Sequence, residues 1–161
     1  MGKIVVRPGR RADAEQFIGL VLALAGFERL EPPSAAGRRR LVADLFTKKR
    51  ISLLVAADGE KLVGYALYFH TYSSFNAKPT LYLEDLYVLD EYRKKGVGYA
   101  LFRRCVEVAV AEGCGRMEWA VLTWNEKAIQ FYERLGARRM SEWYVYRLDE
   151  KALDNVPLKP P

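Results

Sequence analysis

Cysteine and histidine are scarce in this 161-residue sequence, which contains two cysteines and one histidine. Cys105 and Cys114 are too few for a disulfide framework and lack the paired spacing of a zinc site. The single histidine, His70, excludes the HExxH chemistry of metalloproteases and leaves a hydrolase triad with one candidate base. The sequence therefore predicts no metal site, and we interpret His70 as a structural residue of a strand.

Long apolar segments are also missing. The most apolar uncharged stretch, Phe17 to Phe27, is far shorter than the roughly 20 residues that a membrane-spanning helix needs. Met1-Gly2-Lys3 is followed by an apolar run of only Ile4 to Val6, which is not the pattern of a signal peptide. We therefore expect no membrane insertion and a cytoplasmic location.

The composition is typical of a folded domain of ordinary size. Half of the residues (50%) are hydrophobic and 29% are charged, which excludes a disordered or low-complexity chain. There is no internal repeat and no long linker rich in glycine and serine, so we expect a single domain over residues 1–161. The net charge of +6 favours an anionic partner, which is nucleic acid, an anionic membrane or a phosphorylated cofactor.

Hydrophobic periodicity predicts alternating strands and helices. Phe17, Leu20, Val21 and Leu24 repeat at helical spacing, and the Asp-Gly dipeptide at 58–59 is a strong hairpin signal. The expected elements are a strand at 3–7, a helix at 12–24, a second helix capped by Ser34, strands at 51–57, 61–70 and 80–89, a helix at 97–111, a strand at 116–122, a helix at 125–135 and a final strand at 143–148. Their order, βααβββαβαβ, predicts a mixed α/β sheet with parallel strands on either side of helix 97–111.

The most informative segment is the basic loop RKKGVG at 93–98, which joins a predicted strand to a predicted helix. Its glycines let backbone N–H groups turn toward a common point, and the N-terminus of the following helix adds positive potential. Arg93, Lys94 and Lys95 add formal charge. The segment therefore predicts a cradle for a pyrophosphate, although it matches neither the Walker loop nor the GxGxxG pattern.

Two motifs in register make the sequence resemble the GNAT superfamily of N-acetyltransferases. Arg93, Gly96 and Gly98 match the family loop [RQ]-x-x-G-x-[GA]. The second family motif, N-x-x-A-x-x-[FL]-Y-x-x-x-G-[AF], is matched by Asn125, Ala128, Phe131, Tyr132, Gly136 and Ala137. The segments YSSF at 72–75, YLED at 82–85 and WNE at 124–126 are similar to the diamine branch, which includes spermidine/spermine and thialysine acetyltransferases.

The resemblance implies a GNAT-like, centrally splayed sheet and direct transfer of an acetyl group from acetyl-CoA to a primary amine, without a metal. It implies Tyr132 as the acid that protonates the departing thiolate, although Tyr132 also falls on the apolar stripe of its helix. Asn125 is both a candidate helix N-cap and a cofactor contact. The acetyl-CoA contacts implied are Leu86, Tyr87, Val88, Arg93, Lys94, Lys95, Gly96, Val97, Gly98, Tyr99, Asn125 and Tyr132.

Glu84 and Asp85 are charged residues inside an otherwise apolar strand, where charge is costly unless it is solvated or paired. The resemblance implies a β-bulge in this strand, which we expect near residues 85–87. We expect Glu84 to act as the base through a water molecule and Asp85 to bind the amine. The alternative for Glu84 is a buried ion pair or a charge at a strand edge.

The resemblance also places Glu28 and Glu31, between the first two helices, and the aromatic Phe75 at the acceptor. Ser73 stands where the polyamine enzymes lead us to expect an acidic residue, and a net charge of +6 repels a polycation. We therefore expect a small amine, a diamine or a thialysine-like acceptor in preference to spermine.

Two other functions stay open. The first is acetylation of protein N-termini or lysines by the same chemistry. The second, which the sequence favours less, is nucleic-acid binding, because basic runs at 38–40 and 48–50 bracket one predicted helix without any accompanying nucleic-acid motif. The resemblance further implies a homodimer with the strand at 143–148 in its interface.

Overall fold

The computed structural model describes residues 2–157. Its backbone contacts divide the chain into two compact units, Met1–Ala120 and Val121–Pro161. The single domain expected over residues 1–161 stays a prediction.

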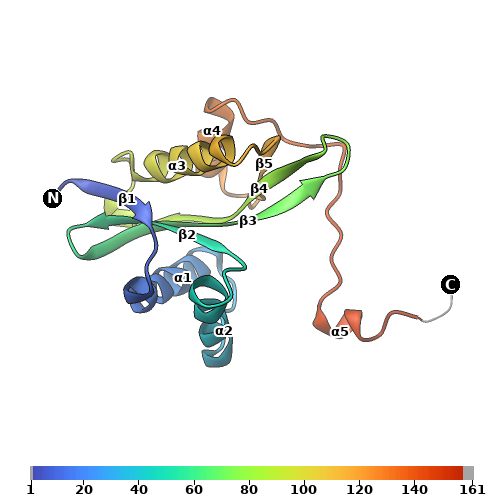
Figure 1. Ribbon diagram of the computed structural model, residues 1–161, viewed down its shortest axis with the longest axis horizontal. Helices are drawn as coiled ribbons and strands as arrows, with labels where there is room; N and C mark the ends of the chain where they lie inside the picture. The colour runs from blue at the N-terminus through green and yellow to red at the C-terminus, as the bar shows by residue number, and fades with distance from the viewer. Residues whose placement is uncertain (1, 158–161) are drawn as a thin grey trace. The chain divides into compact units, whose positions relative to one another are not determined.

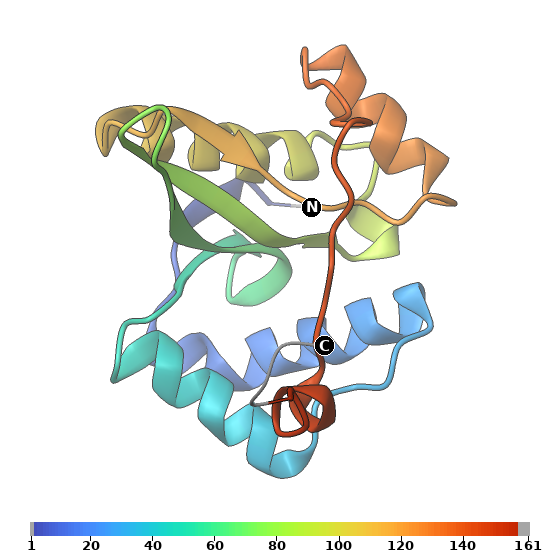
Figure 2. The same ribbon diagram turned by 90° about the vertical axis from the view of Figure 1, so that its right-hand side faces the viewer.

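The first unit is a mixed α/β sheet with helices on both faces, as the sequence predicts. Its elements are β1 (Ile4–Pro8), η1 (Arg11–Asp13), α1 (Ala14–Glu28), α2 (Ala35–Phe46), β2 (Ser52–Asp58), β3 (Lys61–Ser73), β4 (Lys78–Val88), η2 (Asp90–Tyr92), α3 (Val97–Ala111) and β5 (Arg116–Glu118). The strands lie in the order β1-β2-β3-β4-β5, and only the β4–β5 pair is parallel. Figure 1 and Figure 2 show α1 and α2 on one face of the sheet and α3 on the other.

The core on the α1 and α2 side is built from the periodic apolar positions of α1 and alternate positions of the strands. Phe17 of α1 and Tyr65 of β3 are both fully buried, and their rings meet edge to face with centroids 5.1 Å apart. Buried members of this core also include Leu20, Leu45, Leu53, Val55, Ala57, Leu62, Leu67 and Tyr87. Tyr65 therefore joins this core to the middle of the sheet.

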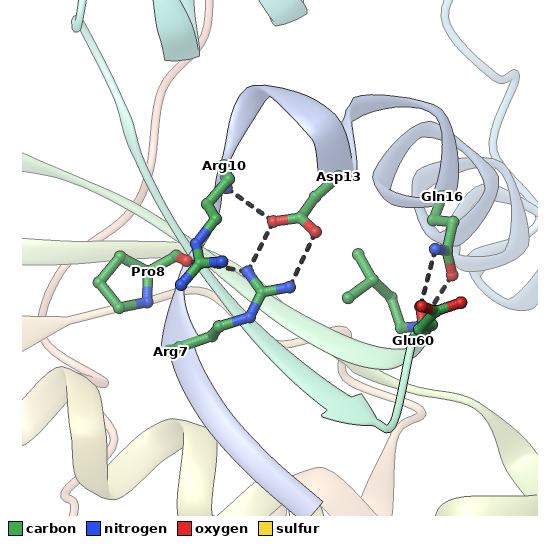
Figure 3. A network of polar contacts seen from close by, with 7 residues as sticks. Arg7, Pro8, Arg10, Asp13, Gln16 and Glu60 are labelled. Atoms are coloured by element: carbon green, nitrogen blue, oxygen red, sulfur yellow. Dashed lines mark hydrogen bonds and ion pairs between the residues drawn. The ribbon is translucent and has the colours of Figure 1, made fainter.

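A polar network holds the start of α1 against the sheet (Figure 3). Arg7 of β1 and the buried Asp13 form a two-pronged ion pair, with N–O distances of 2.7 and 2.9 Å, and the Arg10 N–H also donates to Asp13. Gln16 of α1 accepts a hydrogen bond from the Leu62 N–H at 2.8 Å, and its amide donates to a carbonyl at the β2–β3 turn. These bonds fix the direction in which α1 crosses the sheet.

The second unit contains α4 (Glu126–Arg134) and the short α5 (Glu150–Leu153). The predicted cap is confirmed, because the Asn125 side chain accepts a hydrogen bond from the Ala128 N–H at 3.3 Å. Within residues 2–157, no helix combines the length and the apolar character needed to cross a bilayer.

The strand predicted at 143–148 is wrong. These residues form neither a helix nor a strand, and the side chains from Trp143 to Tyr146 are 74–91% exposed. A strand needs a neighbour to take up its backbone hydrogen bonds, and within residues 2–157 no strand pairs with this segment. The described order therefore ends without the last β of βααβββαβαβ, and β5 ends at Glu118 instead of reaching residue 122.

Candidate active site

Strand β4 carries a β-bulge at Glu84. Leu83 pairs with Tyr68 and Asp85 pairs with Leu67, so Glu84 is an extra residue in the β3–β4 register. Cross-strand partners face the same side of a sheet, and the adjacent residues Leu67 and Tyr68 face opposite sides. The bulge therefore turns Leu83 and Asp85 to opposite faces, although a regular strand would place them on the same one.

The position of the bulge differs slightly from the expected one. It lies at Glu84, one residue before the predicted range of 85–87, because the pairing to β3 shifts between Leu83 and Asp85. β4 pairs with β5 only from Thr80 to Tyr82, and no strand within residues 2–157 continues this pairing toward Val88. The sheet thus opens beside the bulge, and backbone groups on that side of β4 are left without ladder partners.

Asp85 lies partly buried on the face covered by α1. The Tyr65 hydroxyl donates to its Oδ2 at 3.1 Å. Burial raises the pKa of Asp85 to about 6, the hydrogen bond from Tyr65 opposes this rise, and the negative charges of Glu84 and Glu28 add to it. A carboxyl with this pKa changes its charge close to neutral pH, and perturbed groups of this kind are frequent at functional sites.

The fold brings Glu28 to Asp85 from a distant part of the sequence. Glu28 is the last residue of α1, and burial raises its pKa. We call Glu28, Glu84 and Asp85 the acidic cluster, since the charges of Glu28 and Glu84 both act on Asp85. Glu84 is exposed at the bulge and Glu28 is half-buried. The cluster therefore combines a partly desolvated carboxyl with one that faces solvent.

The other two predicted acceptor residues have exposed side chains. Glu31 is exposed in the loop after α1, and Phe75 is 100% exposed in the turn between β3 and β4. Asp85 lies seven positions along β4 from Lys78, at the end of that turn, which is roughly 23 Å of strand. Neither Glu31 nor Phe75 is among the groups that shift the pKa of Asp85.

The basic glycine loop leads directly into α3. Lys94 and Gly96 have positive φ angles of 58° and 79°, and such alternation turns successive N–H groups inward as an anion-binding nest. Gly96 is the N-cap of α3 and has no side chain to cap the first N–H groups. An ideal Cβ at Gly98 would meet only Val88 Cγ2, at 3.8 Å. The loop thus offers unobstructed backbone donors at a helix N-terminus.

The predicted cationic side chains of this loop are arranged unequally. Arg93 Nε donates to the Val88 carbonyl at 3.0 Å, so this side chain is directed toward the protein. Lys94 and Lys95 are both exposed, and Lys95 donates to the Glu91 carbonyl at 2.6 Å. The backbone, rather than the three cations together, is therefore the prominent feature of the loop.

The remaining predicted cofactor residues lie on β4, on the first turn of α3 and in the second unit. Tyr87 and Val88 are buried and Leu86 is half-buried, so their backbone atoms are the groups that a ligand could reach most readily. Val97 is buried and Tyr99 is exposed. In the second unit, Tyr132 is half-buried on α4 beside the Phe131 ring, with centroids 5.2 Å apart.

Two residues of the site carry no sequence signal. Tyr65 reads as one more apolar position of β3, and Phe27 as the end of an apolar helix face, yet one bonds Asp85 and the other stacks on Arg93. Only the pairing of distant elements reveals either contact. Within residues 2–157, no group of three or more His, Cys, Asp and Glu side chains could hold a metal ion.

Tyr65→Phe should raise the pKa of Asp85 above about 6, because it removes a hydrogen bond that stabilises the ionised carboxylate. NMR titration of the carboxyl carbons measures this, with Tyr87→Phe, its cross-strand neighbour, as the control. When the pKa of a carboxyl is higher in the folded state than in the unfolded state, stability falls as pH rises from the unfolded-state value to the folded-state value. The free energy of unfolding of Tyr65→Phe should therefore also fall more steeply than that of the wild type between about pH 4 and pH 7. An unchanged Asp85 titration would contradict the role assigned to Tyr65.

The chain matches known proteins along most of its length. Residues 21–137 match the model of the acetyltransferase (GNAT) family. The chain is 32% identical to the thialysine N-epsilon-acetyltransferase of Sus scrofa, over 95% of this chain and 96% of that protein. It is 42% identical to the L-ornithine N5-acetyltransferase of Arabidopsis thaliana over 59% of this chain and 42% of that protein.

A solved structure described as a possible acetyltransferase from Clostridium difficile 630 has the same fold, with a TM-score of 0.79. It is 22% identical and covers 91% of this chain and 97% of that one. The sequence motifs, the opened sheet and these matches agree. The chain belongs to the acetyltransferase (GNAT) family, whose members transfer acetyl groups to amines.

Proposed function

We propose that this protein transfers the acetyl group of acetyl-CoA to the primary amine of a small acceptor, such as a diamine or a thialysine-like amino acid. The observation that carries the proposal is the acidic cluster beside the bulge of β4, because carboxylates attract an ammonium group. The names of the thialysine and ornithine acetyltransferases support the same class of acceptor. This proposal is more specific than the family assignment.

The acidic cluster would serve two different needs. An alkyl ammonium has a pKa of about 10.4, so at neutral pH it must lose a proton before its nitrogen can attack. A carboxylate close to an ammonium binds it but also stabilises its charged form, so division of the two tasks is an advantage. We propose that the exposed Glu84 accepts the proton through water while Asp85 and Glu28 hold the cation. We also propose Glu31 and Phe75, whose side chains are exposed, as acceptor contacts.

Acetyl-CoA supplies an acetyl group that is already activated as a thioester. The loop fits its pyrophosphate, since the nest at Lys94 and Gly96 precedes an uncapped helix N-terminus. We propose that N–H groups of the segment 93–99 bind the phosphates, with the backbone of residues 86–88 and the side chain of Asn125 as further contacts. We propose Tyr132 as the group that protonates the departing thiolate.

Gly98→Asp should reduce the affinity for acetyl-CoA by more than about tenfold, because it places negative charge against the phosphates. The helix itself should tolerate the change, since a carboxylate near a helix N-terminus is favourable. Gly98→Ala is the matched control, because its Cβ would make only an ordinary contact with Val88. Calorimetry with acetyl-CoA measures both variants. An unchanged affinity in folded Gly98→Asp would mean that acetyl-CoA binds elsewhere.

Tyr132→Phe should lower kcat by about 10²–10⁴-fold with little change in the KM for acetyl-CoA, because the hydroxyl is needed only when the thiolate leaves. Tyr146→Phe, whose hydroxyl lies on an exposed side chain of the same unit, is the control. Single-turnover kinetics with chemistry shown to be rate-limiting give the measurement. A loss smaller than about threefold would reduce Tyr132 to a packing residue.

Consumption of acetyl-CoA should be greatest with small diamines or thialysine-like amino acids in a panel that also contains monoamines, spermine and peptides. Asp85→Asn should raise KM for a diamine more than for a matched monoamine, because the second ammonium depends on the acidic cluster. Preferred turnover of peptides would establish the protein acetyltransferase alternative instead. Failure of every amine would contradict the proposed function.

The ion pairs of the second basic run do not favour nucleic-acid binding. Asp44 pairs with Lys48 at 3.3 Å and with Arg50 at 3.5 Å, so part of the second basic run is neutralised within the protein. Retention of RNA or DNA on a filter at physiological salt would revive this alternative.

We also propose a homodimer whose interface includes residues 143–148. The support is their exposure, since Trp143, Tyr144, Val145 and Tyr146 form a continuous apolar segment in contact with solvent. Sedimentation equilibrium should show a dimer that Tyr144→Asp weakens, and a wild-type monomer would contradict the proposal. The cytoplasmic location stays a prediction.

A further inference from the structure

Arg93 connects the glycine loop to α1, in addition to its place in the family motif. Its Nε donates to the Val88 carbonyl at 3.0 Å, and its Nη1 pairs with Asp90 at 2.8 Å. The guanidinium carbon lies 4.6 Å from the centre of the Phe27 ring and 5.5 Å from that of Tyr87. A planar cation between two aromatic rings, with two further polar bonds, is held in one orientation.

Both aromatic partners of Arg93 lead to the acidic cluster. Phe27 immediately precedes Glu28 in the last turn of α1 and packs against the core. Tyr87 is the cross-strand partner of Tyr65, whose hydroxyl bonds Asp85. Arg93 therefore contacts a neighbour of Glu28 on α1 and a neighbour of the Tyr65–Asp85 pair on β4. Glu28 and Asp85 are the two carboxyls that we propose to hold the acceptor.

We propose that Arg93 is a positioning residue for the amine acceptor: it fixes the end of α1 against β4 and thereby keeps Glu28 beside Asp85. This inference rests on the proposed function. A diamine is bound best when both carboxylates are in place. Loss of the Arg93 contacts therefore weakens binding of a diamine more than binding of a monoamine. The phosphates of acetyl-CoA are then bound by the loop backbone and not by the Arg93 guanidinium.

The alternative role of Arg93, as a direct phosphate ligand, predicts a different result. Removal of a phosphate ligand weakens the binding of acetyl-CoA and leaves the preference between monoamine and diamine unchanged. Removal of a positioning residue changes that choice and leaves acetyl-CoA nearly unaffected. The two roles are therefore separated by which substrate responds.

The decisive variant is Arg93→Gln, which can still donate to the Val88 carbonyl but loses the charge and the cation–π contact. We expect the KM for a diamine to rise about 3- to 10-fold, with less than about a twofold change for a monoamine and for the acetyl-CoA Kd measured by calorimetry. Phe27→Leu, which keeps α1 apolar, should have the same effect. The double variant should raise the diamine KM no more than either single variant does, because both substitutions remove the same contact between Arg93 and Phe27. Asp90→Asn, which removes only the ion pair, is the matched control.

A second measurement does not depend on activity. The charge of Glu28 helps to raise the pKa of Asp85, so displacement of Glu28 in Arg93→Gln should lower the Asp85 pKa in an NMR titration. A tenfold loss of acetyl-CoA affinity with an unchanged diamine KM would overturn the inference, as would additive effects of Arg93→Gln and Phe27→Leu. If the wild-type protein acetylated no amine, the proposed function would fail. The Asp85 titration in Arg93→Gln would then still decide whether Arg93 positions Glu28.

Discussion

The candidate site depends on one inserted residue in β4, the strand beside which the sheet opens. Side chains alternate along a strand, so the extra residue at Glu84 reverses the alternation and sends Leu83 and Asp85 to opposite faces. Without it, Asp85 could not face α1 while Leu83 remained buried on the other side. The same point in β4 is where pairing with β5 has ended. One change of register therefore turns Asp85 toward α1, next to a strand edge that β5 no longer pairs.

The second constraint is the free-energy cost of burying the Asp85 carboxyl, which the bulge turns inward. Burial disfavours the ionised form of Asp85, and one hydrogen bond from Tyr65 compensates only in part, so its pKa stays at about 6. Because the folded-state pKa is raised, the free energy of unfolding falls as pH rises from about 4 through about 6. A bound ammonium would reverse the penalty by pairing with the carboxylate. The desolvation cost of the free site would then favour binding of the proposed acceptor, as is common where a buried charge trades stability for function.

Local signals predicted what depends on neighbours in the sequence. The bounds of α3, the caps at Ser34 and Asn125, and the β2–β3 hairpin follow from periodicity and from single hydrogen bonds within a few residues. The strand at 143–148 failed because a β-rich segment becomes a strand only when another strand pairs with it. The orientation of Arg93 also could not be predicted. Its partner Phe27 is far away in sequence, and a loop motif gives no information on where a long side chain turns.

The short segment from Asp85 to Val88 connects the proposed acceptor region to the proposed cofactor region. Its ends are about 10 Å apart along the strand. The acidic cluster lies at one end, and the carbonyl that accepts the Arg93 hydrogen bond lies at the other. Gly64 pairs with Val88, and a Cβ there would lie 2.7 Å from the Tyr87 carbonyl, so β3 approaches this segment more closely than any side chain allows. That close backbone contact leaves β4 little freedom to shift. Acyl transfer requires reacting atoms to be held within a fraction of an ångström. For the proposed reaction, a segment fixed by β3 on one side and by the Arg93 hydrogen bond at its end would help to meet this requirement.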